Sequence, residues 1–231
     1  MKRFASLLLM KLRSYGRSKR SIFDDVYMNH RWGSNANLEA SSGKGSLPAN
    51  STEYEQFVVD YIKRHNIVSI VDIGCGDFQV SQRILTVLND ERITYLGTDV
   101  SQVIIDRNKI AFESDNIKFQ QLDAGREDLP AAELITVREV LQHLPNKDVE
   151  RILSKLVAHH SDAHILVTNT VATSPDKINV DIPAGTASRA GIGSGLWIDK
   201  PPFNFNVEEV YRRSHRHHDT IIITARLLGY Q

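Results

Sequence analysis

Short apolar runs alternate with segments of helical periodicity through the middle of the chain. The runs are rich in β-branched residues and predict strands at 67–73, 93–97, 117–122, 133–137 and 164–168. Between them, apolar residues recur at helical spacing over 80–88, 100–112 and 146–158. Strands separated by helices of this length are typical of βαβ units. We therefore predict an α/β fold with a Rossmann-like, doubly wound, mainly parallel sheet and helices on both faces.

The segments that flank this alternation have other patterns. A helix is predicted from Ser51, with Ser51 or Thr52 as its N-cap. Residues 1–50 are interpreted as a basic N-terminal segment with a helical or loop lid, and residues 51–231 as the main domain. Residues 171–206, rich in Gly, Pro, Asn and Ser, predict a long loop on the substrate side. A final strand is expected at 220–228.

Composition and charge narrow the class of protein. The 231 residues are 41% hydrophobic and 24% charged, as in ordinary globular proteins, and the formal net charge is zero. Residues 1–20 nevertheless hold seven cations and no acid, so the remainder is acidic, which argues against nucleic acid as a partner. The basic head is either a contact for an anionic membrane or a partner domain, or a frayed terminus. One cysteine excludes an internal disulfide and favours a cytoplasmic location, with peripheral membrane contact as the alternative.

The string Val71-Asp-Ile-Gly-Cys-Gly-Asp77 is the most informative motif. It predicts a buried strand that ends at two glycines, where backbone N–H groups can approach a ligand closely. The next strand ends at Asp99, whose carboxylate can accept both hydroxyls of a ribose. Gln79 stands where a dinucleotide fingerprint has its third glycine, and Asp77 is unfavourable beside a pyrophosphate. A cofactor with an amino group and no phosphate fits better.

Over about residues 52–170, these motifs resemble class I S-adenosylmethionine-dependent methyltransferases. The resemblance implies S-adenosyl-L-methionine as cofactor, with Asp99 on the ribose and Asp123 and Ala124 on the adenine. Asp72 either holds the glycine loop or contacts the amino group of the cofactor. Arg138 and Glu139, where the fourth strand ends, either face the methyl donor or form a buried pair. The implied cofactor site comprises Asp72, Gly74, Cys75, Gly76, Asp99, Val100, Asp123, Ala124, Arg138 and Glu139.

A second resemblance concerns the acceptor of the methyl group. Trp32, Ser42-Gly-Lys-Gly-Ser46, Asn179-Val-Asp181 and Pro201-Pro-Phe-Asn204 are similar to segments of small-molecule and sugar methyltransferases. This implies methylation of a hydroxyl on a small molecule or glycan. A hydroxyl has a high pKa and benefits from a general base. His143, after the fourth strand, is the expected base, and a packed or capping histidine is the alternative reading. Asp181 is a second candidate base, or a partner that orients His143.

Four further residues are expected to contact the acceptor. His30 and Trp32 could belong to the N-terminal lid, or to a helix that simply packs its aromatic rings. Arg189 could hold an anionic group, and Phe203 could stack on a sugar. The histidines at 215, 217 and 218 do not have convincing metal-ligand spacing, so no metal is expected.

Other functions stay open at this point. The chain could be a non-catalytic, cofactor-binding partner subunit, or an N- or carboxylate methyltransferase of a small metabolite. Methylation of nucleic acid is disfavoured. After the fourth strand the chain reads Val137-Arg-Glu-Val, where amino-methylating members of that class carry an Asn/Asp-Pro-Pro-Tyr/Phe tetrapeptide.

Overall fold

The chain folds into two compact units. The computed structural model describes residues 14–34, 41–175, 177–214 and 219–230. Residues 23–135 form one unit, called here the amino-terminal unit, and residues 136–231 with residues 1–22 form the other, the carboxy-terminal unit. Within the described ranges, no helix is long and apolar enough to cross a membrane.

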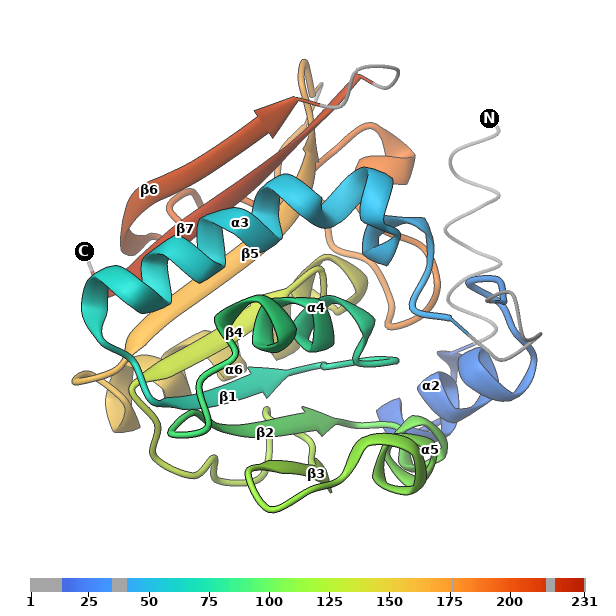
Figure 1. Ribbon diagram of the computed structural model, residues 1–231. Helices are drawn as coiled ribbons and strands as arrows, with labels where there is room; N and C mark the ends of the chain where they lie inside the picture. Colours follow the sequence, from blue (N-terminus) through green and yellow to red (C-terminus); the bar gives the residue numbers. More distant parts are fainter. Residues whose placement is uncertain (1–13, 35–40, 176, 215–218, 231) are drawn as a thin grey trace. The chain divides into compact units, whose positions relative to one another are not determined.

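Strands in the described residues form a seven-stranded sheet with the order β3-β2-β1-β4-β5-β7-β6 (Figure 1). Strand β1 pairs in parallel with β2, and β2 with β3, whereas β7 is antiparallel to both β5 and β6. This confirms the predicted Rossmann-like, mainly parallel α/β fold. The strands are β1 (Ser69–Ile73), β2 (Thr94–Asp99), β3 (Ile117–Gln121), β4 (Leu134–Arg138), β5 (His164–Ala172), β6 (Phe205–Ser214) and β7 (Thr220–Tyr230).

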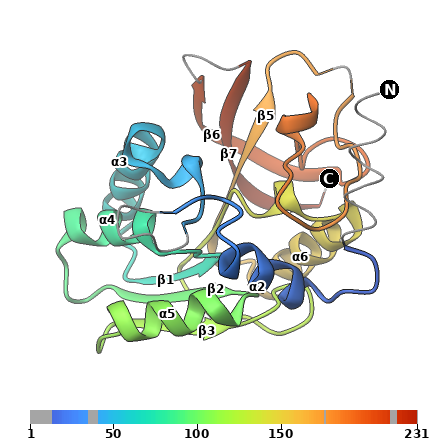
Figure 2. The same cartoon turned by 90° about the vertical axis from the view of Figure 1, so that its right-hand side faces the viewer.

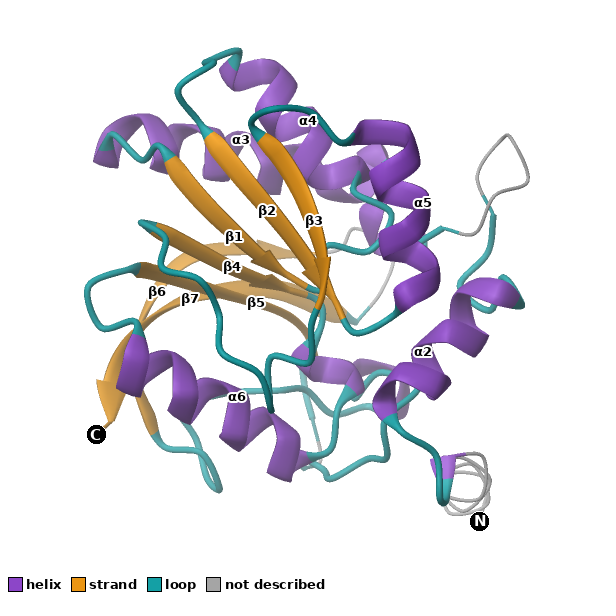
Figure 3. Cartoon of the chain, turned by 90° about the horizontal axis from the view of Figure 1, so that it is seen from below, coloured by secondary structure: helices purple, strands orange, loops and turns teal. Residues whose placement is uncertain are grey.

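Helices α4 (Gln79–Leu88) and α5 (Gln102–Phe112) lie on one face of β1, β2 and β3 in the amino-terminal unit (Figure 3). Aromatic rings fill the space between these layers. The ring of Phe78 lies 5.0–5.3 Å, centroid to centroid, from the rings of Tyr95, Phe112 and Phe119. Phe78 also has a φ of 65°, a conformation that only a residue well held by its surroundings keeps. The packed ring therefore stabilises the turn between β1 and α4.

Helix α3 (Pro48–His65) begins three residues earlier than predicted, with Leu47 as its N-cap. The expectation that Ser51 or Thr52 caps this helix was wrong. Proline is favoured in the first turn because no helical N–H is needed there. The Ser51 and Thr52 hydroxyls instead donate to the carbonyls of Leu47 and Pro48, four residues earlier in the chain, at 2.9 and 2.7 Å.

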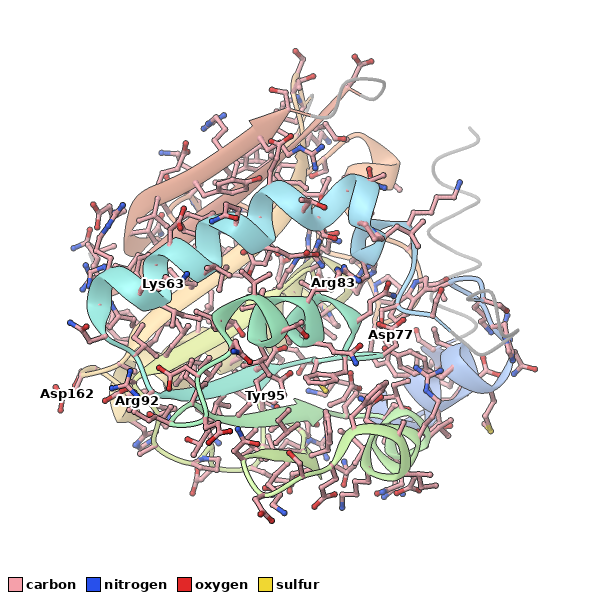
Figure 4. The ribbon with its side chains drawn as sticks, in the orientation of Figure 1. Lys63, Asp77, Arg83, Arg92, Tyr95 and Asp162 are labelled. Carbon is pink, nitrogen blue, oxygen red and sulfur yellow. The ribbon has the colours of Figure 1, made fainter. Side chains whose placement is uncertain are left out.

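A guanidinium joins α3 and α4. Arg83 of α4 donates to the carboxylate of Glu55 on α3, with Nη2 2.7 Å from Oε1, and its Nη2 also donates to the carbonyl of Ser46 at 2.8 Å. Figure 4 shows Arg83 on the side of α4 that faces α3. Arg83 thus anchors the short 3-10 helix Lys44–Ser46 as well as the longer helix.

Strand β6 in the carboxy-terminal unit was not predicted from the sequence. Figures 1 and 2 show it as the outer strand beside β7, with β5 on the other side of β7. Because β5 continues to Ala172 and β6 starts at Phe205, the long loop covers residues 173–204 rather than 171–206. Helix α6 (Asn146–His159) packs against β7 in the same unit.

Candidate functional site

The turn after β1 is built around two glycines with positive φ, 72° at Gly74 and 55° at Gly76. The carbonyl of Thr98 on β2 accepts hydrogen bonds from the backbone N–H groups of Gly74 and Cys75, at 2.7 and 2.9 Å. Buried Asn108 of α5 donates from Nδ2 to the carbonyl of Gly76 at 2.7 Å. Neighbouring strand and helix therefore hold the loop in a single conformation.

Asp99, at the end of β2, points into this turn. Its carboxylate accepts the N–H of Gly76 at 3.2 Å and that of Ser101 at 2.9 Å. Burial raises the pKa of Asp99 from 3.8 to about 6. The two N–H donors oppose that rise, and the charges of Asp72 and Asp24 add to it. The structure thus brings the glycine loop and the predicted ribose-binding acid together.

Asp72 lies beneath the loop, inside the unit. Its Oδ2 accepts the hydroxyl protons of Ser81 on α4 and Tyr95 on β2, at 2.7 and 2.8 Å. These bonds join Asp72 to the neighbouring helix and strand, and its role toward the loop or the cofactor stays a prediction. Burial, followed by the charges of Asp99, Asp72 and Asp77, raises the pKa of the Cys75 thiol, so this cysteine stays protonated at neutral pH.

Residues 41–46 cover the glycine loop, a contact that the sequence did not predict. The N–H of Ser42 donates to Asp77 Oδ2 at 3.0 Å, and the N–H of Asp77 donates to Ser42 Oγ at 2.7 Å. A Cβ on Gly76 would come within 2.1 Å of Ser42 Oγ and 3.2 Å of the Tyr27 hydroxyl. A side chain at Gly76 would therefore clash with the Ser42 hydroxyl, which belongs to the same unit.

Helix α2 (Lys19–Met28) brings Tyr27 and Asp24 to the same end of the strands. Asp24 Oδ1 accepts the Ser101 hydroxyl at 2.7 Å and the N–H of Val103 at 3.3 Å, at the start of α5. Burial, then the charge of Asp99, raises the pKa of the Tyr27 hydroxyl. The segment Phe23-Asp-Asp-Val-Tyr27 was visible as an aromatic stretch, but the partners of Asp24 lie 77 and 79 positions away in the sequence and could not be assigned from it.

The two predicted lid residues His30 and Trp32 have different surroundings. Trp32 is half-buried, with its ring 5.7 Å from that of Tyr27 in an edge-to-face arrangement and 5.9 Å from that of Phe23. His30 is exposed, and its Nδ1 lies 2.7 Å from the Ser34 hydroxyl. Trp32 therefore packs on the tyrosine that touches Gly76, while His30 lies at the surface.

The predicted adenine pair follows β3. The carboxylate of Asp123 accepts the N–H of Gly125 at 3.0 Å and forms a turn, and Ala124 is buried. Val100, in the turn after Asp99, accepts the Gln121 amide on its carbonyl at 3.3 Å. Asp72, Gly74, Cys75, Gly76, Asp99, Val100, Asp123 and Ala124 all belong to the amino-terminal unit.

Arg138 and Glu139, at the end of β4, belong to the carboxy-terminal unit and are half-buried. Glu139 has a φ of 60°, and its N–H donates to the carbonyl of Thr168 at 2.8 Å. Its carboxylate accepts the Thr170 hydroxyl at 2.6 Å. The strained backbone and the short hydrogen bond direct this carboxylate toward the end of β5.

His143 ends the short 3-10 helix Leu141–His143. Its Nδ1 lies 3.0 Å from the carbonyl oxygen of Ala187. A carbonyl can only accept, so we assign the proton to Nδ1 and a lone pair to Nε2. Burial lowers the pKa of His143, although the bond to Ala187 and the charge of Glu139 oppose this, so the ring is neutral at pH 7. These are the properties of a general base.

Gln142 explains the orientation of this imidazole. Its Oε1 accepts the N–H of Thr170 at 2.9 Å, which turns its Nε2 donor toward His143 Nε2 at 3.4 Å. The amide cannot rotate without placing its NH₂ group against another N–H donor. Gln142 therefore favours the tautomer with the lone pair on Nε2. Sequence reasoning missed this residue.

Asp181 occupies a different position from the one expected of a base. It is exposed, and its Oδ1 accepts the N–H of Asn146 at 2.7 Å, the first residue of α6. A carboxylate at a helix N-terminus is stabilising. The structure therefore places Asp181 as a cap of α6, with no hydrogen bond to His143 among the described contacts.

Arg189 corrects an expectation. It was predicted to hold an anionic group of the acceptor, but its side chain is fully buried. Nε donates to the carbonyl of Val180 at 2.9 Å, and the two terminal nitrogens donate to the carbonyls of Leu141 and Leu144 and to Asn146 Oδ1 at 2.6–2.9 Å. Burial lowers the pKa of Arg189 from 12.5 to about 10. Arg189 thus holds the long loop against the segment that carries His143.

Phe203 is also buried, where a stacking residue would be accessible. Asn179 organises the same part of the loop: its Nδ2 donates to the carbonyls of Trp197 and Pro201, each at 2.8 Å, and its Oδ1 accepts the Trp197 N–H at 2.8 Å. The Asn179 and Pro201-Pro-Phe-Asn204 segments noted in the sequence are therefore joined by a hydrogen bond from the Asn179 side chain to a backbone carbonyl.

Two parts of the sequence interpretation lie outside the described residues: the histidines at 215, 217 and 218, and the first four cations of the basic head, at positions 2, 3, 11 and 13. Among the residues that the structure does describe, no three His, Cys, Asp or Glu side chains gather as a metal site would require.

A family described as a methyltransferase domain matches residues 71–162. No curated protein matches the chain by sequence. The fold is similar to that of the N-methyltransferase NodS from Bradyrhizobium japonicum with bound S-adenosyl-L-homocysteine. The TM-score is 0.59 at 14% identity, over 88% of this chain and 98% of that one.

Two further solved structures are comparable. Magnesium protoporphyrin IX methyltransferase from Synechocystis has a TM-score of 0.56 at 13% identity, over 90% of this chain and 97% of that one. Human N-acetylserotonin methyltransferase has a TM-score of 0.57 at 13% identity, over 100% of this chain and 66% of that one. Identities this low establish the shared fold. Residues 71–162 thus match a methyltransferase-domain family, and the chain shares its fold with these solved methyltransferase structures.

Proposed function

We propose that the chain binds S-adenosyl-L-methionine at the glycine loop and transfers its methyl group to a hydroxyl of a small molecule or glycan. The carboxylates around the loop carry this proposal. The negative charges of Asp99, Asp72 and Asp77 help to raise the pKa of the Cys75 thiol, and the charge of Asp24 helps to raise the pKa of Asp99. Such a site favours a cation and disfavours phosphate. S-adenosyl-L-methionine has a sulfonium and an ammonium group and no phosphate.

The residues fit this cofactor in specific ways. Asp99 is held by two backbone N–H groups and keeps acceptor capacity for a ribose diol. Asp123 and Ala124 would line the adenine, as the family resemblance implies. The fold match supports the assignment, since the NodS and protoporphyrin methyltransferase structures contain S-adenosyl-L-homocysteine.

When bound, S-adenosyl-L-methionine supplies an activated methyl group. Proton removal from the acceptor is assigned to His143, whose Nε2 carries the lone pair. The glycine loop and Asp99 would hold the cofactor, and His143 Nε2 would take the proton of the acceptor hydroxyl when that oxygen receives the methyl group. An imidazole that is neutral at pH 7 can accept the proton of a hydroxyl, which has a high pKa and benefits from a general base. Such a base contributes a factor of about 10²–10⁴ in rate.

Small-molecule acceptors are favoured by the comparisons. The protoporphyrin and N-acetylserotonin enzymes are named for small-molecule methylation. The preference for a glycan rests on the sequence resemblance in Trp32, Ser42–Ser46 and Asn179–Asp181. With Arg189 and Phe203 buried, Trp197, which is half-buried in the same loop, is the aromatic residue we propose for a sugar contact.

The test combines binding with transfer. Calorimetric titration with S-adenosyl-L-methionine and S-adenosyl-L-homocysteine should give micromolar binding, about −8 kcal/mol, and Asp99→Asn should weaken it. Tritium from labelled methyl groups should then appear in hydroxyl-bearing nucleotide sugars, glycans or phenols. His143→Ala should retain binding and lose transfer.

Each failure has a separate meaning. Absence of binding by the folded chain would refute the cofactor site. Binding without transfer to any acceptor would favour a non-catalytic partner subunit. Transfer to amines that survives His143→Ala would refute the assignment of a general base and a hydroxyl acceptor.

A further inference from the structure

Asn169, in the second half of β5, is buried with part of its amide unpaired. The residue is 4% exposed, and its Oδ1 has no hydrogen-bond partner among the described residues. A buried acceptor that is left without a donor destabilises the folded state, so nearly all such groups in folded proteins are paired. An amide that the chain itself does not satisfy is therefore a candidate contact for a ligand.

The alternation of side chains along β5 determines where Asn169 points. Thr168 Oγ1 lies 3.0 Å from Thr224 Oγ1 on β7, and Thr170 Oγ1 donates to the Glu139 carboxylate at 2.6 Å. Since residues two apart share a face, both β5 threonines lie on one face of the sheet. Asn169, between them, points to the other face, where neither threonine hydroxyl can reach it.

The face that carries Asn169 is apolar. Val167 and Val171 flank Asn169 on this face of β5, and Ile223 and Ile221 of β7 lie opposite Asn169 and Val171. None of these four side chains can pair with an amide. The two valines are buried, whereas the two isoleucines are half-buried. This face of the sheet is therefore open in part.

Trp197 of the long loop packs against the same face. A Cβ at Gly195 would come within 2.5 Å of both Trp197 Cζ3 and Val171 Cβ, so glycine is needed for the ring to lie against this strand. Asn179 fixes the backbone of Trp197, since its Oδ1 accepts the N–H and its Nδ2 donates to the carbonyl, each at 2.8 Å. Asn169 is two residues from Val171, about 7 Å along the strand, which is about the size of one sugar ring.

The segment that carries His143 is joined to both of these residues. The N–H of Glu139, at the end of β4, donates at 2.8 Å to the carbonyl of the β5 residue that precedes Asn169. Asn146, three residues after His143, donates from Nδ2 to the carbonyl of Asn179 at 2.9 Å. The unpaired amide, the indole and the proposed general base therefore belong to one hydrogen-bonded part of the carboxy-terminal unit.

We propose that Asn169 and Trp197 form a saccharide subsite for the acceptor. The sugar ring stacks on the half-buried indole of Trp197, and one of its hydroxyls donates to Asn169 Oδ1. An aromatic face with a few placed polar groups is the usual lining of a small-molecule site. The inference rests on the proposed function, because it names a sugar ring as the acceptor that presents a further hydroxyl to His143.

The buried amide also provides specificity. A ligand that fills the space beside Trp197 without a hydroxyl leaves Asn169 unpaired, and sites built to hydrogen-bond a hydroxyl reject analogues that lack it. A sugar ring satisfies both the indole and the amide. We therefore expect Asn169 to favour sugars over apolar rings of similar size.

Sugar binding can be measured directly and without the cofactor. The chain has two tryptophans, so a ¹⁵N–¹H spectrum of the full chain contains two indole signals, and Trp32→Phe assigns them. The probes are the methyl glycosides of glucose, galactose, mannose, rhamnose and N-acetylglucosamine, each titrated through the millimolar range. At least one of them should move the Trp197 signal in a saturable way.

Two substitutions separate a ligand contact from a structural residue. Asn169→Leu keeps the branched shape and removes the unpaired acceptor, so it should unfold at a higher urea concentration than the native chain. It should nevertheless bind the glycoside about tenfold more weakly, the effect of losing one hydrogen bond. Asn169→Ala should weaken binding similarly, which keeps the test valid if leucine is too large. Asn206→Leu, at an exposed position of β6, is the matched control and should bind like the native chain.

The possible failures are distinct. A Trp197 signal that no glycoside moves refutes the subsite. Unchanged glycoside affinity in both Asn169 variants shows that the amide pairs only with a buried water, and refutes the contact. Weak binding in two variants that are both less stable than the native chain assigns Asn169 to the structure of β5 and also overturns the contact.

Titration of the same samples with S-adenosyl-L-homocysteine keeps this inference separate from the proposed function. Glycoside binding without cofactor binding refutes the cofactor site and supports the subsite. Cofactor binding without glycoside binding refutes the subsite and leaves the methyltransferase proposal in place.

Discussion

Lowering the pH should weaken cofactor binding through one group, Asp99. Its pKa is raised from 3.8 to about 6, because the carboxyl is buried beside Asp72 and Asp24. At pH 7.5 nearly all of this group is ionised, and at pH 5 only about one tenth is. If the ionised form accepts the ribose hydroxyls, affinity should fall about tenfold between these pH values, about 1.4 kcal/mol.

The same shift affects the stability of the free protein in the opposite direction. A carboxyl whose pKa is raised on folding binds more protons in the folded state than in the unfolded state between about pH 4 and pH 6. Its contribution to the free energy of unfolding therefore falls as the pH rises through this window, by about 3 kcal/mol. Asp99→Asn removes this dependence.

Titration calorimetry with S-adenosyl-L-homocysteine from pH 5 to pH 8, with urea unfolding at the same pH values, checks both effects. Asp106→Asn, an exposed carboxyl on α5, is the matched control and should behave like the native chain. An affinity that is equal at pH 5 and pH 7.5 would refute the reasoning. So would an Asp99→Asn variant with the native pH dependence of binding.

Three other changes test the structure. Arg189→Met should lower the free energy of unfolding by about 3–5 kcal/mol. It deletes four charge-assisted hydrogen bonds of about 1.5–3 kcal/mol each but relieves the cost of a buried guanidinium, and a loss below about 1 kcal/mol in urea denaturation would contradict this. Gln142→Glu should move the acidic limb of the pH–rate profile to higher pH by stabilising the imidazolium, whereas Gln142→Met should lower turnover without that movement; identical profiles would exclude the tautomer role. Ser42→Ala should accelerate hydrogen exchange at the N–H of Asp77, with Thr52→Ala as a neutral control.

The arrangement of the glycine turn and Asp99 was largely predictable. The strand, the two glycines and Asp99 come within one βαβ unit, whose geometry forces them to one end of the sheet. Asp72 belongs to the same unit, but its partners Ser81 and Tyr95 lie on the neighbouring helix and strand and were not predicted. Such elements are specified by the periodicity of short segments, so they can be predicted without knowing how distant parts of the chain fold.

Predictions that depended on long loops fared differently. Arg189 looked like a free cation in a polar loop, and only the folded chain shows it enclosed by the carbonyls of Val180, Leu141 and Leu144. Strand β6 was not predicted, because its bulge and its charged residues disrupt the two-residue alternation by which strands are recognised.

By itself, the sequence determined the α/β class, the glycine loop and the acid that faces it, because these follow from repeating patterns within short segments. The tertiary structure decided which distant groups meet: Ser42 with Asp77, Asp24 with the start of α5, and Gln142 with Thr170. Such meetings depend on the path of the connecting loops. Hydrogen bonds between residues far apart in the sequence fix the path of these loops, so a local sequence pattern does not predict it.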